Sequence, residues 1–278
     1  MRVNNNIDMK RISGWSPLNP RRQLVLAGVA LLLCIAWFEL TPSDLWIQQW
    51  LYDAELQSWI WSRNEPVTRL LLYDGAKRLL VLFALGLIVS LVFCRRIRRW
   101  HNHCRGLRIV VLSLMLVPLC VSGLKHTTNV ACPKSLDQFG GTLPYVRVLE
   151  AYPTDARPAH RQQCFPAGHA SGGFALMSLA FLFRTPRRRH LALLLGVLAG
   201  WITGGYKMAI GDHFFSHTLI SMLLAWFIIN LVVIVEGRLF GGRQGGVAQG
   251  GVAGSQLGDL EDPDRARDDT ALFRRQQS

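Results

Sequence analysis

The sequence predicts an all-α protein: a six-span transmembrane helical bundle with a long outer loop and a disordered C-terminal tail. Half of its 278 residues are hydrophobic and only 18% are charged, whereas soluble domains carry about 25% charged residues. The apolar residues form blocks close to the roughly 20 residues that cross a hydrocarbon core. Arginines cluster in short runs beside these blocks, a pattern typical of cytoplasmic flanks. We therefore interpret the net charge of +13 as a membrane-protein pattern and expect no nucleic-acid partner.

The apolar blocks set the expected domain organisation. We expect spans at residues 23–40, 78–93, 107–124, 170–183, 191–205 and 218–235. The first block could also be a signal peptide, but it starts late and no small-residue cleavage site follows it, which favours a retained helix. This gives a cytoplasmic N-terminal segment at 1–22, a six-helix membrane domain at 23–235, and a glycine-rich, polar and disordered cytoplasmic tail at 236–278.

The basic runs predict the orientation of the spans. They lie in the N-terminal segment and in loops 94–108 and 184–190, which alternate as cytoplasmic segments should. Loops 41–77, 125–165 and 206–217 then face outward. We expect a bacterial inner membrane, with the outer loops in the periplasm and the bilayer itself as a partner.

Two features of the outer loops leave alternatives open. Trp46 and Trp50 are four residues apart, so a helix there presents both on one face, either along the membrane surface or as a loop helix packed on the bundle. Cys132 and Cys164 share the second outer loop. They are either a disulfide, which an oxidising compartment permits, or two free thiols.

Polar residues gather in three clusters at the predicted outer boundary of the membrane. The clusters are residues 125–133, 165–172 and 204–217. A single boundary lysine is usually a membrane anchor, and a single histidine is usually a packed interface residue. Three clusters on the same side of one bundle instead predict a shared pocket.

The residue types in these clusters suit phosphate chemistry. Lysines and backbone amides at a helix start bind phosphate, and histidines can attack phosphorus or protonate a leaving oxygen. His213 and His217 are four residues apart, so they would share a helix face, where one could orient the other. The same pair could alternatively bind a metal ion.

The clusters resemble the signature of the type 2 phosphatidic acid phosphatase superfamily. That signature has three parts. The first is Lys, six residues, then Arg-Pro; the second is Pro-Ser-Gly-His; the third is Ser-Arg, five residues, His, three residues, then Asp. The corresponding residues here, with the same order and spacing, are Lys125 with Cys132-Pro133, Pro166-Ala167-Gly168-His169, and Tyr206-Lys207 with His213 and His217.

The resemblance implies roles for individual residues. His213 would be the nucleophile that forms a phosphohistidine, and His169 would protonate the leaving group. Lys125, Lys207 and the backbone of Gly168 would hold the phosphate. Such chemistry uses no metal and no cofactor, which argues against the metal interpretation of the histidine pair.

Four of the differences from the signature bear most on the chemistry. Cys132 and Lys207 replace arginines, Ala167 replaces a serine, and His217 replaces the aspartate that orients the nucleophile. We retain His217 as a catalytic candidate because a neutral imidazole can accept a hydrogen bond from His213. Asp212 is a weak substitute for the lost carboxylate because on a helix it would project away from its neighbour.

The second outer loop offers replacements for the lost arginine, namely Arg147, Arg157 and Arg161. The leading hypothesis is an integral membrane phosphatase that hydrolyses a lipid phosphate or lipid pyrophosphate at the outer face. The alternatives are a lipid phosphotransferase and a catalytically inactive protein that binds lipid phosphates.

Overall fold

Helices make up most of the chain that the structure describes. A computed structural model describes residues 19–94, 96–97, 100 and 103–240. Residues 1–18 of the expected N-terminal segment and residues 241–278 of the expected disordered tail lie outside the described residues. The chain divides into two units, Met1–Ile234 and Val235–Ser278, and every contact described below lies within the first.

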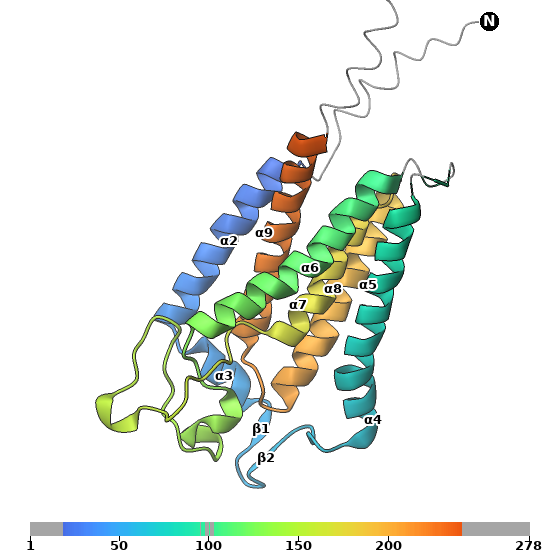
Figure 1. The fold of residues 1–278 in the computed structure, drawn as a ribbon. Helices are drawn as coiled ribbons and strands as arrows, with labels where there is room; N and C mark the ends of the chain where they lie inside the picture. Colours follow the sequence, from blue (N-terminus) through green and yellow to red (C-terminus); the bar gives the residue numbers. More distant parts are fainter. Residues whose placement is uncertain (1–18, 95, 98–99, 101–102, 241–278) are drawn as a thin grey trace, which may run out of the picture. The chain divides into compact units, whose positions relative to one another are not determined.

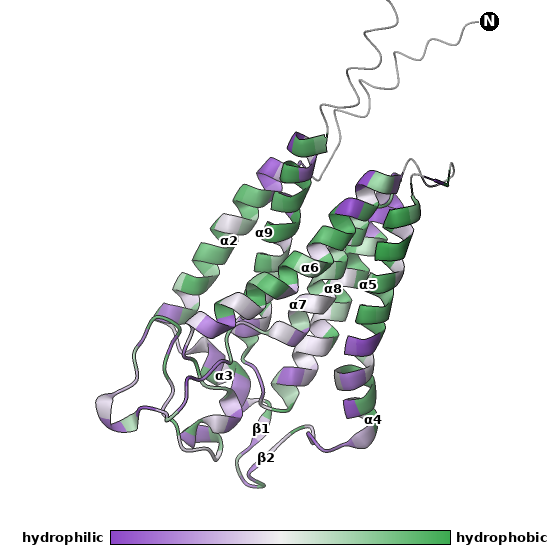
Figure 2. Cartoon of the chain, in the orientation of Figure 1, coloured by the Kyte–Doolittle hydropathy of each residue, from purple (hydrophilic) through white to green (hydrophobic). Residues whose placement is uncertain are grey.

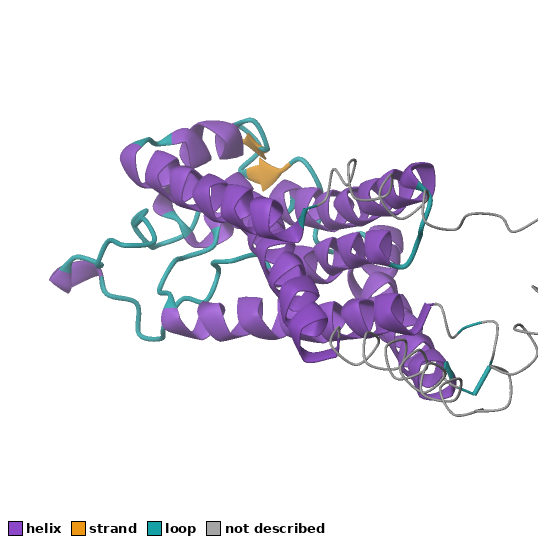
Figure 3. Cartoon of the chain, turned by 90° about the horizontal axis from the view of Figure 1, so that it is seen from above, coloured by secondary structure: helices purple, strands orange, loops and turns teal. Residues whose placement is uncertain are grey.

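The described elements follow one another as long helices joined by short helical turns (Figures 1 and 3). Two short strands form an antiparallel pair, which the all-α prediction did not include. In chain order the elements are α2 Pro20–Leu40, α3 Ser43–Gln49, β1 Tyr52–Asp53, β2 Ser58–Trp59, α4 Pro66–Thr68, the π-helical turn η1 Arg69–Gly75, α5 Ala76–Phe93, α6 Cys104–Thr127, the 3-10 turns η3 Pro133–Ser135, η4 Asp137–Phe139 and η5 Thr154–Ala156, α7 Gly168–Ala175, the 3-10 helix η6 Leu176–Phe181, α8 Pro186–Ala209 and α9 Phe215–Phe240.

Five helices among the described residues are long and apolar enough to cross a membrane. They are α2, the continuous run Pro66–Phe93, α6, α8 and α9. Many of their large apolar side chains are uncovered, as in Leu32 and Leu79, which are 68% and 71% exposed. Figure 2 shows that apolar residues predominate along these helices. So much contiguous apolar surface would cause aggregation in water, so the fold is that of an integral membrane protein.

The second membrane helix begins earlier than the predicted residue 78. Pro66 occupies its first turn, and the carboxylate of Glu65 accepts hydrogen bonds from the backbone N–H groups of Val67 and Thr68 at 3.4 and 2.7 Å. Proline at the first helical position and an acidic cap both favour a helix start. The charged residues between 69 and 78 hid this turn from a search for apolar runs.

The fourth predicted span, residues 170–183, corresponds to the eight-residue α7 and the six-residue η6. These elements pack against α6 and α8 (Figure 1), and Phe174 is completely buried. The absence of side chains at Gly173 and Gly200 permits a close approach, because a Cβ on Gly173 would lie 2.6 Å from the backbone nitrogen of Gly200. This segment is an internal element of the bundle, and the count of six spans stays a prediction.

Helix α3 packs on the bundle by a polar face. Asp44 and Gln48 are buried, while Trp46 and Trp50 are 59% and 87% exposed. The structure therefore favours the loop helix packed on the bundle over a helix lying free along the membrane surface. The two tryptophans face outward and remain available to the headgroup region.

A second cysteine pair lies where the arginine distribution predicts the cytoplasm. Cys94 and Cys104 form a disulfide with their Cα atoms 5.7 Å apart. Because cytoplasmic thiols are kept reduced, we expect this pair as two thiols in a cell that has the predicted orientation.

Candidate active site

The first two sequence clusters are tied together by their backbones. The N–H of Cys164 donates to the carbonyl of Val130 at 3.1 Å, and the Thr128 hydroxyl donates to the carbonyl of Phe165 at 2.6 Å. A disulfide joins Cys132 to Cys164, with 5.2 Å between their Cα atoms. The structure thus contains the disulfide that the sequence left open, and it fixes the end of α6 beside the start of α7.

The third cluster is attached to both of the others. The N–H of Ala167 donates to the carbonyl of His217 at 3.2 Å, and the N–H of Lys134 donates to the carbonyl of Gly211 at 3.0 Å. Three segments far apart in the sequence therefore meet at one end of the bundle, as their placement at one membrane boundary predicted.

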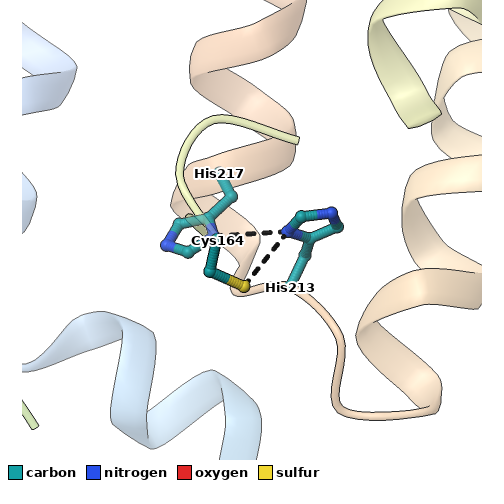
Figure 4. Close-up of side chains that lie close together, drawn as sticks. All are labelled: Cys164, His213 and His217. Atoms are coloured by element: carbon teal, nitrogen blue, oxygen red, sulfur yellow. Dashed lines mark hydrogen bonds between the residues drawn. The ribbon is translucent and has the colours of Figure 1, made fainter. Parts of the chain in front are cut away.

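Two of the predicted site residues form a buried histidine pair. The Nδ1 atoms of His213 and His217 lie 3.5 Å apart, and Sγ of Cys164 lies 3.6 Å from Nδ1 of His213 (Figure 4). His213 precedes α9, which begins at Phe215, so the expectation that both histidines lie on one helix face was wrong for His213. The turn before the helix nevertheless brings the two rings together.

The contacts of Nδ1 fix what His213 can do. A hydrogen bond between two Nδ1 atoms requires one ring to donate and the other to accept. If His213 donates to His217, Nε2 of His213 carries a free lone pair. Burial, followed by the charges of His217 and Lys125, holds the pKa of His213 well below its usual value. The ring is then neutral near pH 7, as a nitrogen nucleophile must be.

The N-terminus of α7 contributes an anion-binding element. The first hydrogen bond of this helix runs from the N–H of Ser171 to the carbonyl of Ala167, so the N–H groups before it have no partner within the helix. A Cβ on Gly168 would lie 3.9 Å from Nζ of Lys125, which shows how closely the lysine crosses this helix start. His169 follows and is exposed, but partial burial of its ring, followed by the charges of Lys207 and Lys125, lowers its pKa to about 4.

Asp212 is the centre of a cluster of positive side chains. Its carboxylate accepts hydrogen bonds from Nζ of Lys207 at 2.8 Å and from Nζ of Lys134 at 2.7 Å, and Arg63 lies 3.7 Å away. Burial alone would raise the pKa of Asp212, but the two lysines outweigh it and lower the pKa to about 2. Asp212 is thus ionised and positions the lysines, and it does not replace the carboxylate missing at His217.

The residues that add positive charge differ from those the sequence suggested. Arg161 donates to the carbonyl of His126 at 2.8 Å, Arg147 lines a small cavity on the side of His217 that faces α2 and α3, and Arg157 lines an open hollow in the outer loop. Lys134 and Arg63 reach the site instead. Lys134 was not among the residues predicted from the sequence, although it directly follows Cys132-Pro133 of the first motif.

Helix α3 holds the turn that carries His213. The carboxylate of Asp44 accepts hydrogen bonds from the backbone N–H of Ser216, at 2.9 Å, and from its hydroxyl. Gln48 donates from Nε2 to the carbonyl of Met208 at 3.0 Å. Burial raises the pKa of Asp44 to about 6, against the lowering effect of the Ser216 hydrogen bonds. Asp44 is ionised at pH 7, where its charge also favours the N-terminus of α9.

A membrane helical bundle with a buried neutral histidine, a second exposed histidine and a lysine cluster at a helix N-terminus has the parts required for phosphoryl transfer. The family model described as the PAP2 superfamily matches residues 106–240, which contain all three clusters. This match confirms the resemblance of the three clusters to that superfamily and points to a phosphatase-type function. No curated protein and no solved structure gave a significant match.

The Asp44 contact can be tested by substitution. We expect Asp44→Ala to lower the free energy of unfolding by about 1–3 kcal/mol, because it leaves the buried N–H of Ser216 without an acceptor. Thermal unfolding of the purified protein in detergent measures this change. Asp53→Ala is the matched control, since Asp53 is exposed and accepts only from the neighbouring amides of Glu55 and Leu56. Equal stability of the two variants would contradict the assigned role of Asp44.

Proposed function

We propose that the chain is an integral membrane phosphatase that hydrolyses a lipid phosphate or lipid pyrophosphate at the outer face of the membrane. The observation that carries this proposal is the convergence of the three clusters through backbone hydrogen bonds. It brings a neutral His213, an exposed His169 and the lysine cluster to one end of the bundle. The match to the PAP2 superfamily supports the phosphatase class.

The positive side chains and the start of α7 would hold the phosphate group. Lys125 crosses Gly168, and Lys207 and Lys134 are held by one carboxylate. Three lysines and Arg63 against one Asp212 leave an excess of positive charge for a phosphate dianion. A bound phosphate would compete with Asp212 for the two lysine ammonium groups, and the backbone N–H groups of α7 would complete the oxygen contacts.

The chemistry then follows from the two histidines. The negative charge of the bound phosphate would raise the low pKa of His169, so that His169 is protonated in the complex. Nε2 of His213 then attacks phosphorus as the bond to the leaving oxygen breaks, and His169 gives that oxygen a proton. This step leaves the phosphoryl group on His213 and neutral His169. His169 then takes a proton from water as the water attacks phosphorus, which releases phosphate and restores His213. His217 supports the first step by accepting the Nδ1 hydrogen bond of His213.

The membrane setting supports a lipid substrate. The site lies at the end of helices that expose apolar surface along their length (Figure 2), so a phosphate headgroup could enter while its apolar chain stays in the bilayer. The arginine runs favour the periplasmic face of a bacterial inner membrane for this end. An oxidising compartment there would preserve the disulfide between Cys132 and Cys164.

The second candidate is a non-catalytic binder of lipid phosphates. Two observations favour it: Cys132, at a signature arginine position, is bound in a disulfide, and Asp212 already occupies the ammonium groups of Lys207 and Lys134. Intact lipid-phosphate binding without turnover would establish this alternative. A lipid phosphotransferase would use the same residues, with a second lipid in place of water, and labelled phosphate on that lipid would identify it.

The catalytic assignment predicts that purified protein releases phosphate from a lipid-phosphate panel and that a chelator leaves this release unchanged. We expect His213→Ala to abolish release, because the nucleophile is gone. His169→Ala should lower kcat by about 10²–10⁴-fold, the usual contribution of proton transfer. His103→Ala serves as the control, because the His103 ring contacts the carbonyl of Leu182 instead of the site. Release that survives both site substitutions would remove this mechanism.

The contribution of Lys134 gives a second prediction. A hydrogen bond to a charged group is worth about 1.5–3 kcal/mol, and 1.4 kcal/mol corresponds to tenfold. We therefore expect Lys134→Ala to raise KM for the active lipid phosphate by about 10–100-fold. Arg157→Ala, which removes a positive charge elsewhere in the outer loop, should leave KM nearly unchanged. Equal effects of the two substitutions would mean that only general surface charge attracts the substrate.

A further inference from the structure

The histidine pair has a sulfur atom as its third neighbour. Among the described residues, ligand atoms of Cys164, His213 and His217 all lie within 4.8 Å of one another, and all three side chains are buried. Figure 4 shows Sγ of Cys164 and Nδ1 of His217 on the same side of the His213 ring. A histidine pair alone is a weak indication of a metal site, but the fold adds a cysteine that is distant in sequence.

The separations match those of ligands around a tetrahedral zinc ion. Zinc bonds of 2.0–2.1 Å to nitrogen and 2.3 Å to sulfur place two nitrogens about 3.3 Å apart and a nitrogen and a sulfur about 3.6 Å apart. The observed distances are 3.5 Å between Nδ1 of His213 and Nδ1 of His217, and 3.6 Å between Sγ of Cys164 and Nδ1 of His213. The third pair, Sγ of Cys164 and the ligand nitrogen of His217, lies within 4.8 Å, so these two atoms would approach each other by up to about 1.2 Å for this coordination.

We propose that Cys164, His213 and His217 form a binding site for Zn²⁺ or a similar borderline divalent ion when the Cys132–Cys164 disulfide is reduced. One thiolate and two imidazoles are ligands that such ions prefer, and the fourth position is left for a small ligand. The disulfide form cannot bind the ion in this way because its sulfur atoms carry no thiolate.

The backbone holds two of these ligands in advance of binding. The N–H of His213 donates to the carbonyl of Lys207 at 3.2 Å, and the carbonyl of His217 accepts from Ala167 at 3.2 Å. Sγ of Cys164 lies 2.8 Å from the carbonyl oxygen of Asp212, which would be a suitable acceptor for the free thiol. The metal ion therefore displaces one proton and requires little rearrangement of the chain.

Opening of the site requires a reductant, which we take to be a dithiol. The dithiol transfers two electrons and two protons to the disulfide, so that Cys132 and Cys164 become thiols and the dithiol becomes a disulfide. Cys164 then loses its thiol proton as the sulfur–metal bond forms. Exchange with a second disulfide, which takes up the two electrons and two protons and becomes a dithiol, reverses the sequence and releases the ion.

Metal binding should block the proposed phosphatase reaction. The ion would occupy Nδ1 of His213, so Nδ1 could no longer donate a hydrogen bond to His217. The ring would then be less able to carry the positive charge that develops as Nε2 attacks phosphorus. This consequence rests on the proposed function, whereas binding of the ion does not.

The test uses the full-length chain in detergent with Co²⁺ as a spectroscopic probe. Cys132→Ser frees Cys164 without any reductant, and Cys132→Ser/Cys164→Ser is the matched control without that thiol. We expect one Co²⁺ per chain in the single variant, with a thiolate-to-cobalt charge-transfer band and the visible bands of a four-coordinate site, and loss of these bands when Zn²⁺ is added. Absence of the band, or an equal band in the double variant, would overturn the proposal.

A second measurement needs no substitution. Wild-type protein is reduced with a phosphine, which takes up the oxygen of water and becomes a phosphine oxide, and is then alkylated with or without Zn²⁺. We expect Zn²⁺ to slow alkylation of Cys164, read by mass spectrometry, and to leave the free Cys120 unaffected. Equal alkylation of Cys164 in both samples would overturn the site. Zn²⁺ binding with unchanged phosphatase turnover would instead contradict the nucleophilic role of His213 and leave the metal site standing.

Discussion

The turn between α8 and α9 is held from several directions, and the arrangement of the candidate site depends on that restraint. Gln48 binds the carbonyl of Met208 at the end of α8, and Asp44 binds Ser216 at the start of α9. The N–H of Lys134 binds the carbonyl of Gly211 within the turn. Gly211 has a positive φ of 72°, a conformation that glycine adopts readily. His213 is therefore placed by contacts that come from two separate parts of the chain, α3 and the segment that contains Lys134.

A second consequence of this restraint is the arrangement of charge. Asp212 lies in the same turn, and it gathers Lys207 from α8, Lys134 from η3 and Arg63 from the segment before α4. One carboxylate among these cations keeps them close together while leaving a net positive site for an anion. The first motif has lost its arginine at Cys132, but Lys134 returns a positive charge to the same neighbourhood. In the folded chain, Lys134 thus replaces part of the positive charge that the signature loses at Cys132.

Much of the fold could be predicted because apolar runs report lipid-facing helices directly. Five of the expected spans correspond to long helices with similar bounds. The start at Pro66 was missed because charged residues interrupt the run that follows it. Residues 170–183 were predicted as a span, and the structure has α7 and η6 there, with glycines that permit close packing inside the bundle. Hydropathy cannot distinguish burial in protein from burial in lipid.

The candidate site was predictable where its residues lie within short motifs. The order and spacing of Lys125, His169 and His213 identified the three segments that the structure brings together. Asp44 and Gln48 could not be found in this way, because they belong to a polar face with no motif and act through contacts more than 150 residues away in sequence. Lys134 and Arg63 were missed for a related reason. The sequence gives the number of positive residues, but the fold determines which of them lie beside Asp212.

The central claim is that the turn presents Nε2 of His213 to a bound phosphate, and its most direct test is detection of the covalent intermediate. Purified protein would be mixed with a labelled lipid phosphate, quenched in alkali within the first turnover, digested and analysed by mass spectrometry. A phosphohistidine is stable in alkali, so it should be found on the peptide that contains His213, and it should decay at the rate of phosphate release. Phosphate release without label on that peptide, or with label on a different residue, would contradict the account.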